Sequence, residues 1–177
     1  MIREYSIWLV PRGKDYRTLQ RVMSDLQTKH NSPQFGPHVT LIGKLDMPPE
    51  LMIEKTKQLA SRLTPFEVKL GGIDALKDYY YKCLFARVTQ TAELLEANEI
   101  AQRTFGTKER YEPHLSLVYG YFPPEIKDAT LKDISHKLDV SFRSDELYLF
   151  STADGVANWY ELGRFPMRDW YLGKANR

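Results

Sequence analysis

A five-residue pattern occurs twice in this chain, and its repetition constrains the fold more than any other feature. The first copy is Pro-His-Val-Thr-Leu at 37–41, and the second is Pro-His-Leu-Ser-Leu at 113–117. The likeness continues downstream, because PHVTLIGKLDMPPE and PHLSLVYGYFPPE align from Pro-His to Pro-Pro-Glu with a one-residue gap. Self-similarity of this extent predicts a duplicated structural unit with approximate twofold symmetry.

The elements expected around the two copies follow the same order: strand, helix, strand with histidine, helix, strand. Apolar and β-branched residues predict the strands, and Pro-Pro-Glu is expected to open a helix after each histidine strand. The expected strands are 5–10, 38–43 and 66–73 in the first half, and 79–88, 114–120, 140–152 and 159–167 in the second. The last two can form a hairpin, and a helix is expected at 91–106. We therefore expect one domain, 1–177, with an internal repeat of roughly 1–72 and 78–166.

The composition is that of an ordinary globular chain, with 42% hydrophobic and 27% charged residues. A net charge of +2 is too small to predict a nucleic-acid-binding protein by itself, but it fits an anionic small molecule or an RNA end. Cys83 is the single cysteine, so no intrachain disulfide can form, and we expect a buried thiol in the 79–88 strand. No apolar run approaches the ~18 residues of a membrane span. We expect a cytoplasmic monomer without membrane contact.

The repeated motif places an imidazole and a hydroxyl on one face of each strand. Side chains alternate between faces along a strand, so His38 and Thr40 point the same way, as do His114 and Ser116. Pseudo-twofold packing can bring both pairs to one groove. Two imidazoles and two hydroxyls facing each other suit an anion with a tetrahedral centre, because hydroxyls donate hydrogen bonds to phosphate oxygens.

A pair of histidines can hydrolyse a phosphodiester without a metal ion or another cofactor. One neutral imidazole takes a proton from water, and one protonated imidazole gives a proton to the departing oxygen. We assign water activation to His114 and protonation of the departing oxygen to His38, and the near symmetry of the motifs leaves the reverse assignment open. His30 and His136 are expected on solvated surfaces, without a chemical role.

The paired His-x-Thr and His-x-Ser motifs resemble those of the 2H phosphoesterase superfamily. YSIWLVP near the start, YYYKCLFARV and HLSLVYG look like the cyclic phosphodiesterase family of plants and yeast, and this resemblance spans nearly the whole chain. It implies a bilobal α+β fold, with an antiparallel sheet flanked by helices in each of two pseudo-symmetric lobes around a central groove. It also implies hydrolysis of ADP-ribose 1″,2″-cyclic phosphate to the 1″-phosphate, and of nucleoside 2′,3′-cyclic phosphates to 2′-phosphates.

The resemblance also assigns site residues. It implies that His38 and His114 are catalytic, that Thr40 and Ser116 bind phosphate, and that Trp8 and Tyr119 contact the base or sugar of the substrate. Trp8 can equally be a core residue. Tyr119 lies at an odd offset from His114, so it reaches the groove only if the strand bulges or ends early near Gly120. The disulfide cysteines of plant members are absent here.

Several alternatives remain open at the level of sequence. A metal site is disfavoured because the partners of the histidines are hydroxyls rather than carboxylates or thiolates. Ser116 lacks the Gly-x-Ser-x-Gly elbow of a serine nucleophile. An RNA-end 2′,3′-cyclic phosphodiesterase or 2′–5′ RNA ligase, and a non-catalytic nucleotide-binding module, are the rival functions. Scattered basic residues can edge a nucleotide site or form a solvated face: Arg103, Lys108, Arg110, Arg164 and Arg168.

Overall fold

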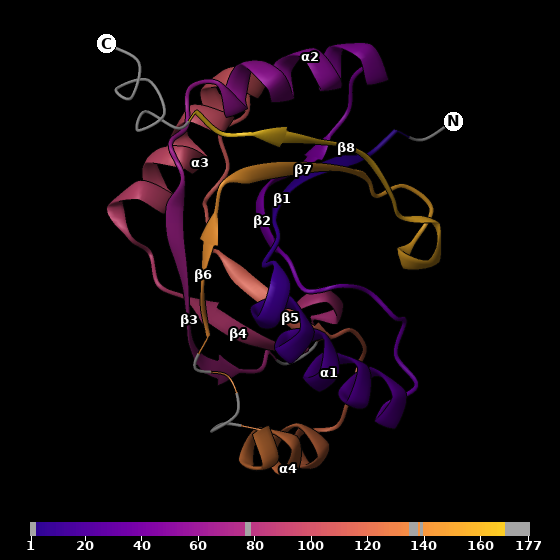
Figure 1. Cartoon of the computed structure of the whole chain (residues 1–177). Coiled ribbons are helices and arrows are strands. Elements are labelled where there is room, and N and C mark those ends of the chain that lie inside the picture. Colours follow the sequence, from indigo (N-terminus) through magenta and orange to yellow (C-terminus); the bar gives the residue numbers. More distant parts are fainter. Residues whose placement is uncertain (1–2, 77–78, 135–137, 139, 169–177) are drawn as a thin grey trace.

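The computed structural model describes residues 3–76, 79–134, 138 and 140–168 (Figure 1). In chain order the regular elements are β1 Tyr5–Leu9, α1 Gly13–Lys29, β2 Val39–Leu45, α2 Pro49–Ala60, β3 Phe66–Asp74, the 3₁₀ turn η1 Tyr80–Lys82, β4 Leu84–Val88, α3 Ala92–Phe105, β5 His114–Val118, α4 Pro124–Ile134, β6 Ser141–Ser144, β7 Glu146–Ser151, the 3₁₀ turn η2 Val156–Asn158 and β8 Tyr160–Pro166. The series β1–α1–β2–α2–β3 has the same order as β4–α3–β5–α4–β6. The expected α+β class with a repeated element order is therefore confirmed.

All eight described strands form one curled antiparallel sheet with the order β6-β3-β4-β5-β2-β1-β7-β8. The two motif strands, β2 and β5, lie at its centre. They share a single paired position, Val39 with Leu115, whereas the pairs on either side are longer. The sheet is thus two four-stranded groups joined at one point, which corresponds to the two expected lobes.

The strands of each group come from both halves of the sequence. β3 from the first half pairs with β4 and β6, and β7 from the second half pairs with β1. The helices cross over in the same way, since α1 packs against β5 and α3 packs against β2. Figure 1 shows α2 and α3 along one side of the curled sheet and α1 and α4 at the other end. The expected single-domain division stays a prediction, but neither half of the chain completes a four-stranded group alone.

The helices begin and end where local chemistry favours it. The side chain of Thr91 accepts a hydrogen bond from the Leu94 amide and caps α3, and Gly106 ends that helix in the left-handed conformation, with φ of 71°. Proline stands in the first turns of α2 and α4, as the Pro-Pro-Glu repeat predicts. The buried faces of these helices cover the apolar side of the sheet.

The expected strand at 79–88 is wrong in its first part, where residues 80–82 form η1. Three backbone carbonyls there accept hydrogen bonds from outside a strand ladder: Tyr80 from the Gly120 amide, Lys82 from the Leu76 amide, and Tyr81 from the Ser116 hydroxyl. These tertiary bonds outweigh the strand propensity of the tyrosines. Cys83 therefore precedes β4 rather than lying in it, but it is fully buried as expected, and burial raises the pKa of its thiol.

The expected strand at 140–152 is two strands. β6 pairs with β3, and β7 pairs with β1, so the chain changes from one four-stranded group to the other at Asp145. The expected hairpin with the last strand is confirmed by the antiparallel pairing of β7 and β8. Leu138 lies beyond the end of α4 but is buried. His136 lies outside the described residues.

Candidate active site

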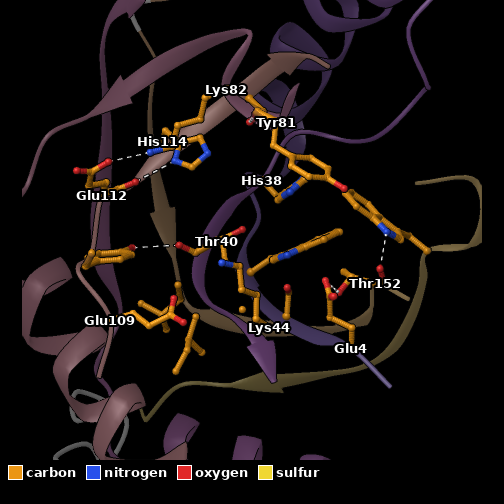
Figure 2. Close-up of a pocket in the computed structure, with 18 of the residues that line it drawn as sticks. Glu4, His38, Thr40, Lys44, Tyr81, Lys82, Glu109, Glu112, His114 and Thr152 are labelled. Atoms are coloured by element: carbon orange, nitrogen blue, oxygen red, sulfur yellow. Dashed lines mark hydrogen bonds and ion pairs between the residues drawn. The ribbon is translucent and has the colours of Figure 1, made fainter. Parts of the chain in front are cut away.

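A cavity of about 760 Å³ lies beside the junction of β2 and β5. Its wall includes all four side chains of the repeated motif: His38, Thr40, His114 and Ser116. Figure 2 shows the first three of them around the cavity. The apolar partners in the motif, among them Val39 and Leu115, are fully buried on the other face of the sheet. The alternation of faces along each strand therefore brings the polar halves of both motifs to one cavity.

The register of the junction interleaves the two motifs. Val39 lies opposite Leu115 in antiparallel pairing, so the residue before one lies beside the residue after the other. This places His38 across from Ser116, and Thr40 across from His114. Each imidazole thus shares the cavity with the hydroxyl of the other motif, in addition to the hydroxyl two residues along its own strand.

His38 is anchored by a hydrogen bond and an aromatic stack, and its lowered pKa favours the neutral imidazole near pH 7. Its Nδ1 lies 2.8 Å from the Gly36 carbonyl, so Nδ1 carries the proton and Nε2 is left to act as a base. Trp8 stacks on the imidazole, with ring centroids 3.7 Å apart and an interplanar angle of 15°. The side chain is only 7% exposed. Burial is the main cause that lowers the pKa of His38 from its ordinary 6.5 to about 4; the Gly36 carbonyl opposes this shift, and the nearby His114 adds to it.

His114 has the same backbone anchor in a more polar setting. Its Nδ1 lies 2.9 Å from the Glu112 carbonyl, which again leaves Nε2 free. Partial burial is the main cause that lowers the pKa of His114, and the positive charge of Lys82 adds to it, while the Glu112 carbonyl and carboxylate raise it. Lys82 itself pairs with the Glu112 carboxylate at 3.1 Å. His114 is thus the more accessible imidazole, and it lies beside a pair of opposite charges.

The two hydroxyls differ in their present partners. The Ser116 hydroxyl is buried and donates to the Tyr81 carbonyl at 2.7 Å. Thr40 is only partly buried, and its carbonyl accepts a hydrogen bond from the Tyr111 hydroxyl at 3.2 Å. That bond fixes β2 beside the cavity. To donate to a bound phosphate, the Ser116 hydroxyl must rotate away from the Tyr81 carbonyl. The described hydrogen bonds include none from the Thr40 hydroxyl, so Thr40 has no such bond to break.

The two aromatic residues implied by the resemblance both line the cavity. Trp8 has a ring on each face: His38 on one, and Phe150 on the other with centroids 4.0 Å apart. It can reach a ligand only through its edge, and its closest ring contact is with the imidazole of His38. Tyr119 follows β5, which ends at Val118, so the expected early end of the strand turns it to the cavity. It is 4% exposed and stacks on Phe35.

Other cavity residues have no role assigned from the sequence. Tyr81 and Lys82 stand in the YYYKCLFARV stretch, and Glu112 precedes the second motif; η1 and the segment before β5 bring them to the cavity. Among the basic residues considered from sequence, Arg110 lines the cavity and pairs with Glu112, whereas Arg103 and Arg164 pair with glutamates elsewhere.

Two kinds of feature are absent from the described ranges, 3–76, 79–134, 138 and 140–168. No three His, Cys, Asp or Glu side chains of these ranges lie together as a metal site, so the expected independence from metal stays a prediction. Every described helix is too short or too polar to cross a lipid bilayer.

The arrangement of strands matches that of several solved structures. TT0787 of Thermus thermophilus is similar with a TM-score of 0.68 and 15% identity, over 96% of this chain and 100% of that chain. A structure described as a phosphoesterase has a TM-score of 0.64 and 13% identity, over 95% of this chain and 100% of that chain. LigT of E. coli in its apo form has a TM-score of 0.60 and 14% identity, over 94% of this chain and 98% of that chain. Identities this low establish the fold alone. A comparison with curated proteins found no match.

The fold and the paired motifs define a 2H phosphoesterase. Residues 2–170 match the family described as cyclic phosphodiesterase-like protein. Because this match covers nearly the whole chain, the protein belongs to the cyclic phosphodiesterase-like family.

Proposed function

We propose that the protein hydrolyses small cyclic phosphodiesters without a metal ion, by general acid–base catalysis between His38 and His114. The substrates proposed are ADP-ribose 1″,2″-cyclic phosphate, which gives the 1″-phosphate, and nucleoside 2′,3′-cyclic phosphates, which give 2′-phosphates. The observation that carries this proposal is the pairing of Val39 with Leu115, which brings two imidazoles and two hydroxyls to one cavity. Both imidazoles are anchored through Nδ1, so both can present Nε2 to one phosphorus atom.

The different surroundings of the two histidines favour different roles for them, one as the general base and one as the general acid. His38 has the lower pKa, about 4, so it is neutral near pH 7 and is suited to accept a proton. His114 is more exposed and lies beside Glu112, so an arriving phosphate anion favours its protonated form. This order favours His38 as the base and His114 as the acid, the reverse of the assignment made from sequence.

The reaction then balances within the pair. A water oxygen attacks phosphorus while its proton passes to Nε2 of His38, and the bond from phosphorus to one ribose oxygen breaks. That oxygen receives the proton from Nε2 of His114. The hydroxyls of Thr40 and Ser116 donate to the non-bridging oxygens, and the charge of Lys82 attracts the anion to the cavity.

Structures of E. coli LigT with 3′-AMP, ATP, NADP+ and phosphate support a nucleotide-sized ligand in this fold. The cavity volume of about 760 Å³ also suits such a ligand. The proposed partner is therefore a small cyclic-phosphate nucleotide.

A second candidate function is that of an RNA-end 2′,3′-cyclic phosphodiesterase or a 2′–5′ RNA ligase. Lys44, Lys82 and Arg110 line the same cavity and can contact further phosphates. An RNA substrate makes affinity fall steeply with salt, because each neutralised phosphate releases counterions. A nucleotide-binding module without catalysis is the third candidate, and it binds the cyclic phosphate without forming a product.

One experiment separates these candidates. The protein is incubated with a chelator and with ADP-ribose 1″,2″-cyclic phosphate, adenosine 2′,3′-cyclic phosphate or an RNA ending in a cyclic phosphate, and the products are identified by phosphorus NMR. Monoester signals from the two small substrates are expected. Turnover of the RNA alone favours the second candidate, and binding without any product favours the third. If the chelator abolishes all turnover and added metal restores it, the metal-independent mechanism is contradicted.

A further inference from the structure

A half-exposed tyrosine on η1 has no role in the chemistry described above. Tyr81 lines the cavity with 51% of its surface exposed, and it lies between Tyr80 and Lys82 on that turn. Figure 2 shows Tyr81 and Lys82 in the same cavity as the two histidines. An exposed aromatic ring beside a phosphate site can stack against a nucleobase, because every base presents a flat π-face.

The position of Tyr81 is fixed from two sides. Its carbonyl accepts the hydrogen bond from the Ser116 hydroxyl at 2.7 Å, so its backbone is tied to a motif side chain. Its ring meets Tyr80 and Tyr119 edge to face, with centroids 5.0 and 5.2 Å away. No described aromatic ring lies parallel to it. Tyr81 is therefore an oriented ring within one side-chain length of Ser116.

Several other aromatic rings line the cavity. Tyr79 is 49% exposed, but no described hydrogen bond ties it to a motif side chain, and Trp159 lies edge-on to His38 and donates to the Thr152 carbonyl. Two further rings are covered. Trp8 is covered by His38 and Phe150 on its two faces, and Tyr119 is stacked on Phe35 and 4% exposed. Tyr81 has the larger free surface. The neighbouring Lys82 adds a positive charge, so η1 presents an aromatic face and a cation side by side.

We infer that Tyr81 stacks against the base bonded to the same ribose that carries the cyclic phosphate, and thereby makes nucleoside 2′,3′-cyclic phosphates the preferred substrate class. This inference rests on the proposed function, because it needs the phosphate at the two histidines. The Tyr81 backbone lies one hydrogen bond from the Ser116 hydroxyl, and this closeness suits a base attached directly to that ribose. The adenine of ADP-ribose 1″,2″-cyclic phosphate is separated from the cyclic phosphate by a second ribose and a pyrophosphate, so it does not fit this position.

The test compares Tyr81→Ala and Tyr81→Phe with the unmodified protein on three substrates. These are adenosine 2′,3′-cyclic phosphate, methyl riboside 2,3-cyclic phosphate, which has no base, and ADP-ribose 1″,2″-cyclic phosphate. Tyr81→Ala keeps the backbone carbonyl that accepts from Ser116, so it removes the ring alone. Tyr121→Ala is the matched control, because Tyr121 is 72% exposed, contacts the ring of Tyr80 and is not part of the cavity wall.

We expect Tyr81→Ala to lower kcat/KM for adenosine 2′,3′-cyclic phosphate by roughly tenfold or more, as loss of one stacked base predicts. The base-free and ADP-ribose substrates should change little, Tyr81→Phe should retain the preference for the base, and Tyr121→Ala should act like the unmodified protein. An equal loss on all three substrates, or no loss on any, overturns the inference.

The failure of the proposed function has a different signature. In that case the unmodified protein hydrolyses none of the three substrates, and binding decides the inference instead. The affinities of adenosine 2′-phosphate and inorganic phosphate are then measured by calorimetry. Tyr81→Ala should weaken binding of the nucleotide and leave phosphate binding unchanged. Equal effects on both ligands, or no effect on the nucleotide, overturn the role of Tyr81.

Discussion

Val39 pairs with Leu115 where β2 meets β5, and this pair joins the two four-stranded groups of the sheet. Both side chains are fully buried. Because the histidines adjoin this pair in sequence, a change in packing beneath the junction alters how the two imidazoles face each other. We therefore expect the junction to couple the packing of the core to the geometry of the cavity.

Leu115→Ala and Leu117→Ala test that coupling as a matched pair. Both leucines are fully buried in β5, so each truncation should lower the free energy of unfolding by about 2–5 kcal/mol. Leu115→Ala should lower turnover more than Leu117→Ala does, because the space that it leaves lies beneath the junction. Activity is measured where denaturant titration finds both variants folded. Equal turnover of the two variants contradicts a special role for the junction.

His38→Ala and His114→Ala should each remove most turnover while the fold remains. A placed acid or base contributes a factor of ~10²–10⁴, so a loss of at least a hundredfold in kcat is expected for either variant. His30→Ala is the control, because His30 does not line the cavity. Circular dichroism checks the fold. Near-normal hydrolysis by either cavity variant is incompatible with the proposed mechanism.

The pH dependence of kcat/KM should be bell-shaped with an acidic optimum. Activity requires neutral His38, whose pKa is about 4, and protonated His114, whose pKa lies below its ordinary 6.5 because of burial and Lys82. Activity should decrease at pH values below the pKa of His38 and at pH values above the pKa of His114. The two apparent pKa values belong to the pair. Initial rates at constant ionic strength measure the profile. A steady rise through pH 8 contradicts this prediction.

Stability should also fall in acid because of His38. The unfolded imidazole has its ordinary pKa of 6.5 and the folded one about 4, so the unfolded state binds more protons between these values. The contribution of neutral His38 to the free energy of unfolding is complete above pH 6.5. It is lost as the pH falls toward 4, and the loss is roughly 3 kcal/mol. Urea titrations at several pH values measure it. His38→Gln should flatten the slope, and an unchanged slope would show that His38 is not buried neutral.

Lys82→Met should raise the pKa of His114. The ammonium of Lys82 lowers that pKa and neutralises the Glu112 carboxylate, so its removal takes away a positive charge and frees a negative one. A titration followed by NMR of the His114 ring reports the shift without any substrate. Lys55→Met is the control, because the Lys55 ammonium donates to the Thr104 carbonyl outside the cavity. A lowered or unchanged value contradicts the proposed contact.

The sequence predicted the site better than its surroundings because the motif repeats and its side chains alternate. A duplicated histidine and hydroxyl need only strand geometry to share a face, and that part of the fold is local. Tyr119 needed one further condition, the early end of β5, which the structure meets. The role of Lys82 depends on η1, whose shape follows from hydrogen bonds to Leu76, Gly120 and Ser116. Tertiary contacts of this kind leave no pattern in the sequence.

Trp8 illustrates a second limit of prediction from sequence. Its strand and its burial follow from the apolar run, but its stacking partners come from β7 and from the segment before β2. In the same way, β6 and β7 lie beside β3 and β1, which are far from them along the chain. Propensity describes a strand and not its neighbour, so the exchange of strands between the two groups becomes visible only in the assembled sheet.

The exchange of strands has a consequence for how the protein can be made. β1 lies between β2 and β7, so a nascent chain that stops before Glu146 leaves one side of β1 without a neighbour. An open edge of that kind is a site for pairing with another chain, and a ribosome holds the chain in this state until the second half has been synthesised. Synthesis of the C-terminal strands thus closes the edge, and hydrolytic competence should arise late, as a property of the finished polypeptide.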